Sequence, residues 1–176
     1  SAALKLLDVA FFHEEYQKKA ISKNIGWMPN NIYVLPHGST ENLNPNKEEL
    51  RKELGYENKL VVGAAGLADQ RKGFRTLIRQ WKYVVKKFPN AMLSLEIKPH
   101  AAKETREYIN KVMTEIMKSP VSKNIEIIVK EYGEMEFLNK LASFDILALP
   151  YKSESQSGVL AHGFAANTPA VVTDIE

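Results

Sequence analysis

The chain has 176 residues, of which 44% are hydrophobic and 26% are charged, so it can bury the core of one globular domain or slightly more and is not intrinsically disordered. No apolar run approaches the roughly 18 residues of a spanning helix and the first residues carry no signal-peptide pattern, which predicts a soluble protein. The absence of cysteine excludes disulfides and thiolate chemistry, and the net charge of +3, spread among alternating acids and bases, indicates a solvated surface and no nucleic-acid partner.

The first part of the chain contains two short strand patterns around one helix. Asp8 to Phe12 (DVAFF) is typical of a strand, residues 14–24 of a helix, and residues 32–36 (IYVLP) of a second strand that ends before His37 and Gly38. Residues 39–46 (STENLNPN) are polar and rich in turn formers, so they are the best candidate for a linker or hinge. A short helix is expected over residues 47–54.

From Leu60 onward, strand and helix patterns alternate. Apolar residues recur at helical spacing from Phe74 to Phe88, where Pro89 stops the helix, and again over residues 109–117 and 135–142. Runs rich in Val, Ile and Leu predict strands at residues 60–65, 91–97, 125–129, 145–150 and 170–173. Five strands separated by helices predict an α/β fold with a parallel sheet covered on both faces.

Two loops of this second part are expected to bind a ligand. In LVVGAAGLADQRKGF, a buried strand runs into a glycine-bearing loop that presents Arg71 and Lys72. In LALPYKSESQSGVLAHGF, a strand runs into a polar loop before a helix that begins at Gly158. These loops follow the first and fourth strands counted from Leu60, and the crevice of a doubly wound sheet opens between the carboxyl ends of those strands. Because a helix N-terminus presents unpaired N–H groups, an anionic ligand is expected there.

Four segments in this order resemble the nucleotide-sugar-binding domain of the retaining GT-B glycosyltransferases of family 4. They are IYVLPHG (the hinge of the family), VVGAAGLADQRKGF, FDILALPYKSESQSGV and ANTPAVVTD, and together they extend over nearly the whole chain. The resemblance implies a Rossmann-like doubly wound parallel sheet that forms one half of a GT-B architecture. It also implies that residues 1–38 are the end of an N-terminal domain with its hinge, and that residues 39–176 are a donor-binding domain truncated at its C-terminus.

The resemblance assigns roles in the first loop. In the family, the Lys before the second glycine neutralises the donor diphosphate, and Lys72 is that residue. Many members carry an Arg directly after the loop glycine, here Gly66, but this chain has Leu67, so Arg71 is the expected substitute. The competing interpretation is that Arg71 and Lys72 merely begin a helix on a wet surface. Cations are unfavourable at a helix N-terminus, however, and a bound anion would offset this repulsion.

In the second loop, the family carries two glutamates separated by seven residues. Glu154 matches the first, which contacts the transferred sugar, and is the catalytic candidate. His162 stands where the second would contact the ribose, so it either hydrogen-bonds a hydroxyl or has no role. Gln156, Ser157 and Gly158 resemble a branch that holds the diphosphate through hydroxyls and backbone N–H groups. Ser157 is also expected to cap the helix, and both roles are compatible.

No metal or cofactor is expected, and the nucleotide sugar is a substrate. The chain has no Asp-x-Asp motif, and lysine, arginine and the helix dipole supply the charge neutralisation. The histidines at 13, 37 and 100 have no metal-ligand spacing. Asp145, at the start of a strand, is expected to make a structural hydrogen bond.

The resemblance implies transfer of a hexose to a glycan, lipid or other acceptor held by the N-terminal domain, as in polysaccharide biosynthesis. The fragment itself is expected to bind nucleotide sugar weakly and to have no turnover, with DVAFF docked on this domain or on a second copy of it. A cytoplasmic location is expected, and the basic pairs at 18–19 and 86–87 leave contact with acidic lipid at the inner membrane face open. Two other interpretations remain: a GT-B-like epimerase or phosphorylase, and a non-catalytic nucleotide-binding or scaffolding domain.

Overall fold

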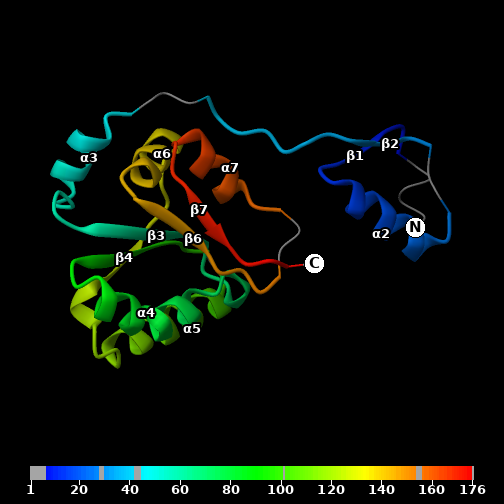
Figure 1. Ribbon diagram of the computed structural model, residues 1–176. Helices are drawn as coiled ribbons and strands as arrows, with labels where there is room; N and C mark the ends of the chain where they lie inside the picture. The colour runs from blue at the N-terminus through cyan, green and yellow to red at the C-terminus, as the bar shows by residue number, and fades with distance from the viewer. Residues whose placement is uncertain (1–6, 28–29, 42–44, 101, 154–155, 176) are drawn as a thin grey trace. The chain divides into compact units, whose positions relative to one another are not determined.

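The computed structural model describes residues 7–27, 30–41, 45–100, 102–153 and 156–175. The chain divides into two compact units, Ser1–Ser39 and Thr40–Glu176 (Figure 1). Glu154, the predicted catalytic carboxylate, lies outside the described residues, as does Ser155. Within the described ranges, no helix has both the length and the apolar character needed to cross a bilayer.

The first unit is a two-stranded parallel sheet with one helix. Strand β1 (Ala10–Phe12) pairs with β2 (Ile32–Val34), with Ala10 opposite Ile32. Helix α2 (Glu15–Ile25) lies between them in sequence and begins with a capping box, in which the side chain of Gln17 accepts a hydrogen bond from the backbone N–H of Glu14. These are the elements that the sequence predicts here.

The second unit contains a five-stranded parallel sheet in the order β5-β4-β3-β6-β7. The strands are β3 (Leu60–Leu67), β4 (Ala91–Lys98), β5 (Ile125–Val129), β6 (Ile146–Leu149) and β7 (Ala170–Val172). The chain moves outward from β3 to β5 and returns to β6 on the other side of β3, so the strand order reverses between β3 and β6. This confirms the predicted Rossmann-like doubly wound fold.

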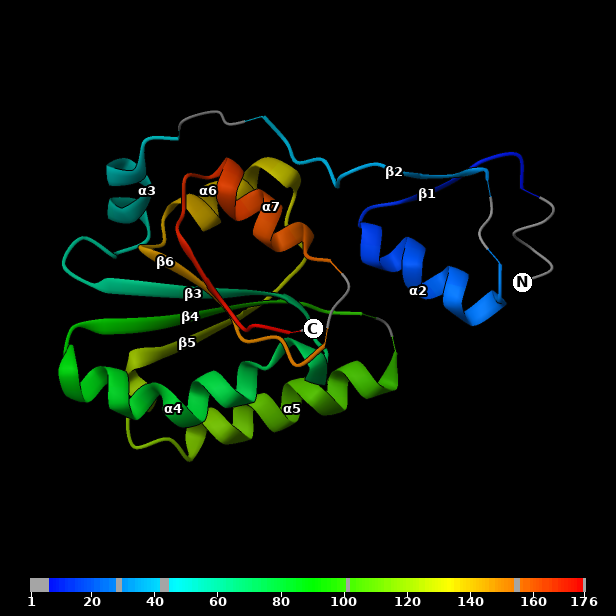
Figure 2. The ribbon, with the colours of Figure 1, turned by 45° about the vertical axis from the view of Figure 1, so that its right-hand side comes forward.

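Helices cover both faces of this sheet (Figure 2). Helices α4 (Phe74–Lys87) and α5 (Lys103–Met117) lie on one face, and α6 (Glu134–Ala142) and α7 (Gly158–Ala165) lie on the other. The apolar stripe predicted for α4 is the face that packs on the sheet, with Phe74, Ile78 and Trp81 buried. Helix α5 begins earlier than its apolar stripe indicates, because Thr105 and Tyr108 are also buried in its polar first turns.

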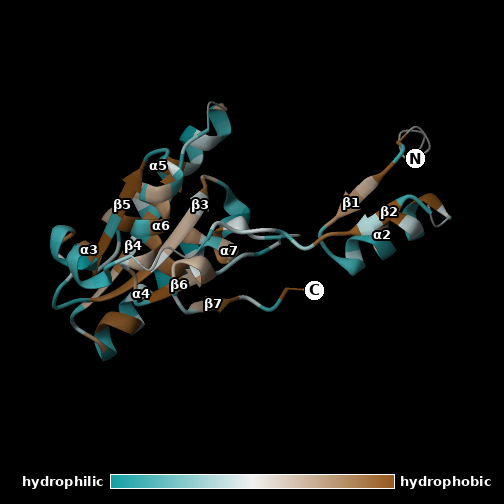
Figure 3. Ribbon diagram, turned by 90° about the horizontal axis from the view of Figure 1, so that it is seen from above, coloured by the Kyte–Doolittle hydropathy of each residue, from teal (hydrophilic) through white to brown (hydrophobic). Residues whose placement is uncertain are grey.

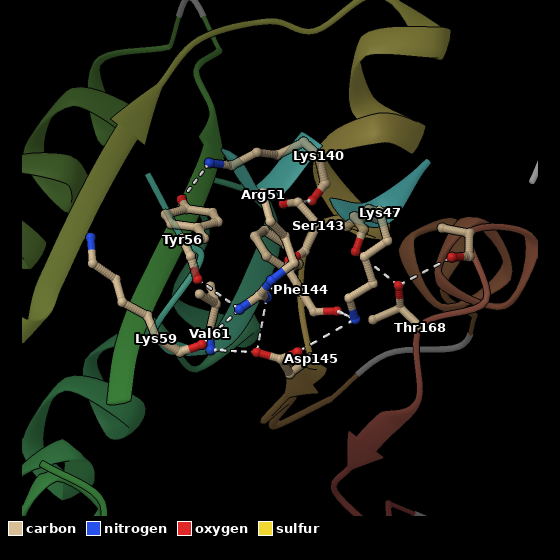
Figure 4. Close-up of polar contacts among 12 residues, drawn as sticks. Lys47, Arg51, Tyr56, Lys59, Val61, Lys140, Ser143, Phe144, Asp145 and Thr168 are labelled. Carbon is tan, nitrogen blue, oxygen red and sulfur yellow. Dashed lines mark hydrogen bonds and ion pairs between the residues drawn. The ribbon is translucent and has the colours of Figure 1, made fainter. Parts of the chain in front are cut away.

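Helix α3 (Lys47–Glu53) differs from the others because none of its residues is buried. It is coloured largely as hydrophilic, whereas β3 is coloured as apolar (Figure 3). Charged contacts to the amino ends of the strands hold it in place (Figure 4). The Arg51 guanidinium lies 3.0 Å from the Asp145 carboxylate and donates to three backbone carbonyls. Lys47 donates to the Phe144 carbonyl at 2.6 Å.

Asp145 is the centre of this contact, because it also accepts a 2.8 Å hydrogen bond from the backbone N–H of Val61 at the start of β3. The carboxylate therefore joins β3, β6 and α3, which confirms the structural role expected for it. We call Asp145, Arg51 and Lys47 the amino-end cluster.

Candidate functional site

The two loops predicted to converge are in contact at the carboxyl ends of β3 and β6. The backbone N–H of Lys152 donates to the carbonyl of Arg71 at 2.8 Å. Gly73 has a left-handed φ of 71°, and a Cβ atom at this position would lie 2.0 Å from the carbonyl oxygen of Pro150. Glycine is therefore required at position 73 both by its backbone conformation and by the close approach of the second loop.

Lys72 is buried between these loops, with only 8% of its surface exposed. It is the last residue of the short 3-10 helix Gln70–Lys72, and its stem passes Gly66, where an added Cβ would lie 3.5 Å from the Lys72 Cδ. Its Nζ lies 4.1 Å from the centroid of the Tyr151 ring. The interpretation of Lys72 as a residue of a wet surface is thus wrong, because the side chain is enclosed by the two loops.

Arg71 is arranged differently. Its side chain is 53% exposed and makes a two-pronged contact with Asp69, with Nη2 2.8 Å and Nε 3.1 Å from Oδ2. This hydrogen bonding by Arg71 lowers the pKa of Asp69 below its ordinary value. Asp69 thus offsets part of the Arg71 charge, and contact of Arg71 with a diphosphate stays a prediction.

Ser157 caps helix α7 as expected, since its Oγ accepts from the backbone N–H of Leu160 at 3.1 Å. Gln156 is half-buried directly before it, and Gly158 is the first residue of the helix. The hydroxyl of Tyr151 lies 3.0 Å from the Ser157 Oγ. Tyr151 therefore touches both Lys72 and Ser157. Sequence reasoning missed this residue, although an aromatic side chain directly after Pro150 was the available signal.

His162 lies on α7 and lines a pocket of about 370 Å³. Its Nδ1 is 2.7 Å from the carbonyl oxygen of Gly158, and since a carbonyl can only accept, Nδ1 donates this hydrogen bond. In the neutral ring Nε2 is then an acceptor. The pocket is also lined by Gly66, Leu67, Glu96, Lys98, Tyr132, Glu134, Phe137 and Val159. Because the Lys72 stem passes beside Gly66, this pocket adjoins the loop that carries Lys72.

A buried charged network reaches the pocket from the interior of the sheet. Glu96 in β4 is 2% exposed, and its Oε1 accepts from Ser94 Oγ at 2.6 Å and lies 3.3 Å from Lys140 Nζ. Burial alone would lower the pKa of Lys140, but Glu96 and the other partners together raise it, so Lys140 is charged. The Tyr132 hydroxyl donates to the other oxygen of Glu96. The sequence predicts only a strand here, although a glutamate inside a buried strand was a signal of such a partner.

No known family model and no curated protein sequence matches the chain. Among solved structures, it is similar to Anabaena HepE in complex with UDP and glucose (18% identity, TM-score 0.76, covering 94% of this chain and 44% of that one). It is also similar to a UDP-forming α,α-trehalose-phosphate synthase from Burkholderia xenovorans (11% identity, TM-score 0.77, covering 94% of this chain and 46% of that one). A glycosyltransferase from Rickettsia africae matches at 15% identity and a TM-score of 0.78, covering 96% and 45%.

At these identities the similarity establishes the fold, which is that of one half of a GT-B glycosyltransferase. The chain spans less than half the length of each of these proteins.

Proposed function

We propose that this chain is the donor-binding half of a retaining GT-B glycosyltransferase of family 4 and that it binds a nucleotide-diphosphate sugar where its two loops meet. The observation that carries the proposal is Lys72, a buried cation held by an aromatic ring at the point where strand order reverses. The fold shared with Anabaena HepE, which was solved with UDP and with UDP-glucose, supports this choice of ligand.

In this proposal the diphosphate lies between Lys72 and the start of α7. Lys72 supplies one positive charge, and Gln156, Ser157 and Gly158 supply side-chain donors and the N–H groups of the helix N-terminus. The exposed Arg71 is a second cation, which gives up its contact with Asp69 to contact the diphosphate. These groups stabilise the nucleoside diphosphate most strongly as it departs with its full negative charge, which lowers the barrier to transfer.

The nucleoside occupies the pocket beside Gly66. With Nδ1 fixed by the Gly158 carbonyl, the free Nε2 of His162 accepts a hydrogen bond from a ribose hydroxyl, as a carboxylate would. Glu154 faces the transferred hexose. Support for that position comes from its neighbours in sequence, since Lys152 is bonded to Arg71 and Ser157 to Tyr151. The acceptor, a glycan or a lipid, is bound by a separate domain. The enzyme acts in the cytoplasm.

Binding of UDP and GDP to the chain tests the proposal. Titration calorimetry should detect binding of at least one of them, and Lys72→Ala should weaken it at least about 10-fold, because a phosphate loses a charge-assisted contact. Lys82→Ala is the matched control, since Lys82 also lies over a tyrosine ring, that of Tyr83, but is exposed on α4.

If neither diphosphate binds at millimolar concentration, the proposal is wrong and a scaffolding domain becomes the better interpretation. Analysis of the products that the full-length protein forms from a panel of nucleotide sugars then separates transfer from epimerisation and phosphorolysis. The anomeric configuration of the product tests retention directly.

A further inference from the structure

Tyr132 and Glu96 form a hydrogen-bonded pair in the wall of the pocket that His162 also lines. Tyr132 lies in the loop between β5 and α6, and its hydroxyl donates to Glu96 Oε2. Two further rings line the same space: Phe137 lies 5.9 Å from Tyr132 and 5.8 Å from His162, measured between ring centroids. The pocket thus combines aromatic surface, on which a base can stack, with one phenolic hydroxyl.

The direction of the Tyr132 hydrogen bond is fixed from inside the protein. The other oxygen of Glu96 already accepts from Ser94 and lies against the Lys140 ammonium, so the side chain is a carboxylate that can only accept. The Tyr132 proton must therefore point to Glu96. Burial and the hydrogen bond to Glu96 raise the pKa of Tyr132, so the proton stays on the phenol. The hydroxyl oxygen is left with its lone pairs as an acceptor for the pocket.

We propose that Tyr132 selects the base of the nucleotide, accepting a hydrogen bond from bases with a ring N–H and disfavouring bases with a ring lone pair. Uracil N3–H and guanine N1–H are such donors, whereas cytosine N3 and adenine N1 are acceptors. A base nitrogen with a lone pair, placed opposite the Tyr132 oxygen, leaves both the nitrogen and the oxygen without a hydrogen bond. A site that binds a ligand N–H therefore discriminates strongly against analogues that lack this N–H. This inference rests on the proposed function, because it requires a nucleoside in this pocket.

Two pairs of diphosphates test the inference, because they differ in the base alone. UDP and CDP form a pyrimidine pair, and inosine diphosphate and ADP form a purine pair in which only the first member has the ring N–H. Calorimetry on the chain should give at least about 10-fold weaker binding for the second member of each pair. Tyr132→Phe should remove the difference by lowering the affinity for UDP to that for CDP. Tyr83→Phe, an exposed tyrosine on α4, should leave all four affinities unchanged.

Glu96→Gln is the second variant, and it also serves if Tyr132→Phe does not fold. An amide no longer requires the Tyr132 proton, so the hydroxyl can also donate, and UDP and CDP should bind within about 3-fold of each other. If the wild type binds all four diphosphates equally, or if both variants still discriminate between the bases, Tyr132 does not select the base. In either case the proposed function stands. If none of the four binds, the proposed function fails and the selection of the base fails with it.

Discussion

The two ends of the second unit's sheet use the same residue types for different purposes. At the amino end, Arg51 and Lys47 both form ion pairs with the carboxylate of Asp145. At the carboxyl end, Lys72 lies over an aromatic ring and His162 lines a pocket. The difference shows that the end of the sheet at which a cation lies, more than its residue type or burial, separates a structural cation from a candidate ligand-binding one.

The largest effect is expected at the amino end. Asp145→Ala removes the acceptor of the Val61 N–H and the counter-ion of Arg51, which is itself mostly buried, so unfolding free energy should fall by about 2–3 kcal/mol. Urea denaturation measures this loss. Nucleotide affinity should not change, and a large change in affinity with little loss of stability would contradict the division of roles between the two ends.

A smaller effect is expected at the carboxyl end, where His162→Ala should change binding and not folding. Loss of the Nε2 acceptor should weaken the binding of a ribonucleoside diphosphate about 3-fold to 10-fold, because one hydrogen bond to a ribose hydroxyl is lost. The corresponding 2′,3′-dideoxy nucleotide should bind equally to both proteins. Should its affinity fall by the same factor, His162 acts through packing against Phe137 and not through the ribose.

The smallest effect is expected away from both ends, between α4 and α5. Hydrogen bonds from Arg79, and then Arg75, lower the pKa of Glu115 to about 2. Since the folded pKa lies below the unfolded value of about 4.5, this contribution to stability is complete above pH 4.5 and is lost as the pH falls toward 2. Glu115→Gln should therefore flatten the stability profile only in this acidic window, as measured by thermal melting. An unchanged profile would show that the ion pairs are too exposed to matter.

The elements of the fold were predictable because their signals are local. Apolar spacing at α4, with Pro89 after it, indicates a helix wherever the chain is folded, and the alternation of strands and helices then indicates a parallel sheet. The contact between the two loops also followed, since the carboxyl ends of neighbouring parallel strands lie side by side.

The partners of buried side chains could not be predicted in the same way. Lys140 meets Glu96 and Tyr56, and Lys72 meets Tyr151, across long separations in sequence. Such pairs depend on the register between strands and on the way helices pack over them, which no local pattern records. Arg51 was missed for the same reason, although the structural role of its partner Asp145 was predicted.

The contact between Gly73 and Pro150 restricts how this region can move. Because no side chain fits at position 73, and because the Lys152 N–H donates to the Arg71 carbonyl, the end of the 3-10 helix is tied to the residues directly after β6. A ligand that pulls on either one displaces both. Lys72 and the residues directly after β6 are therefore expected to keep their separation when a ligand binds.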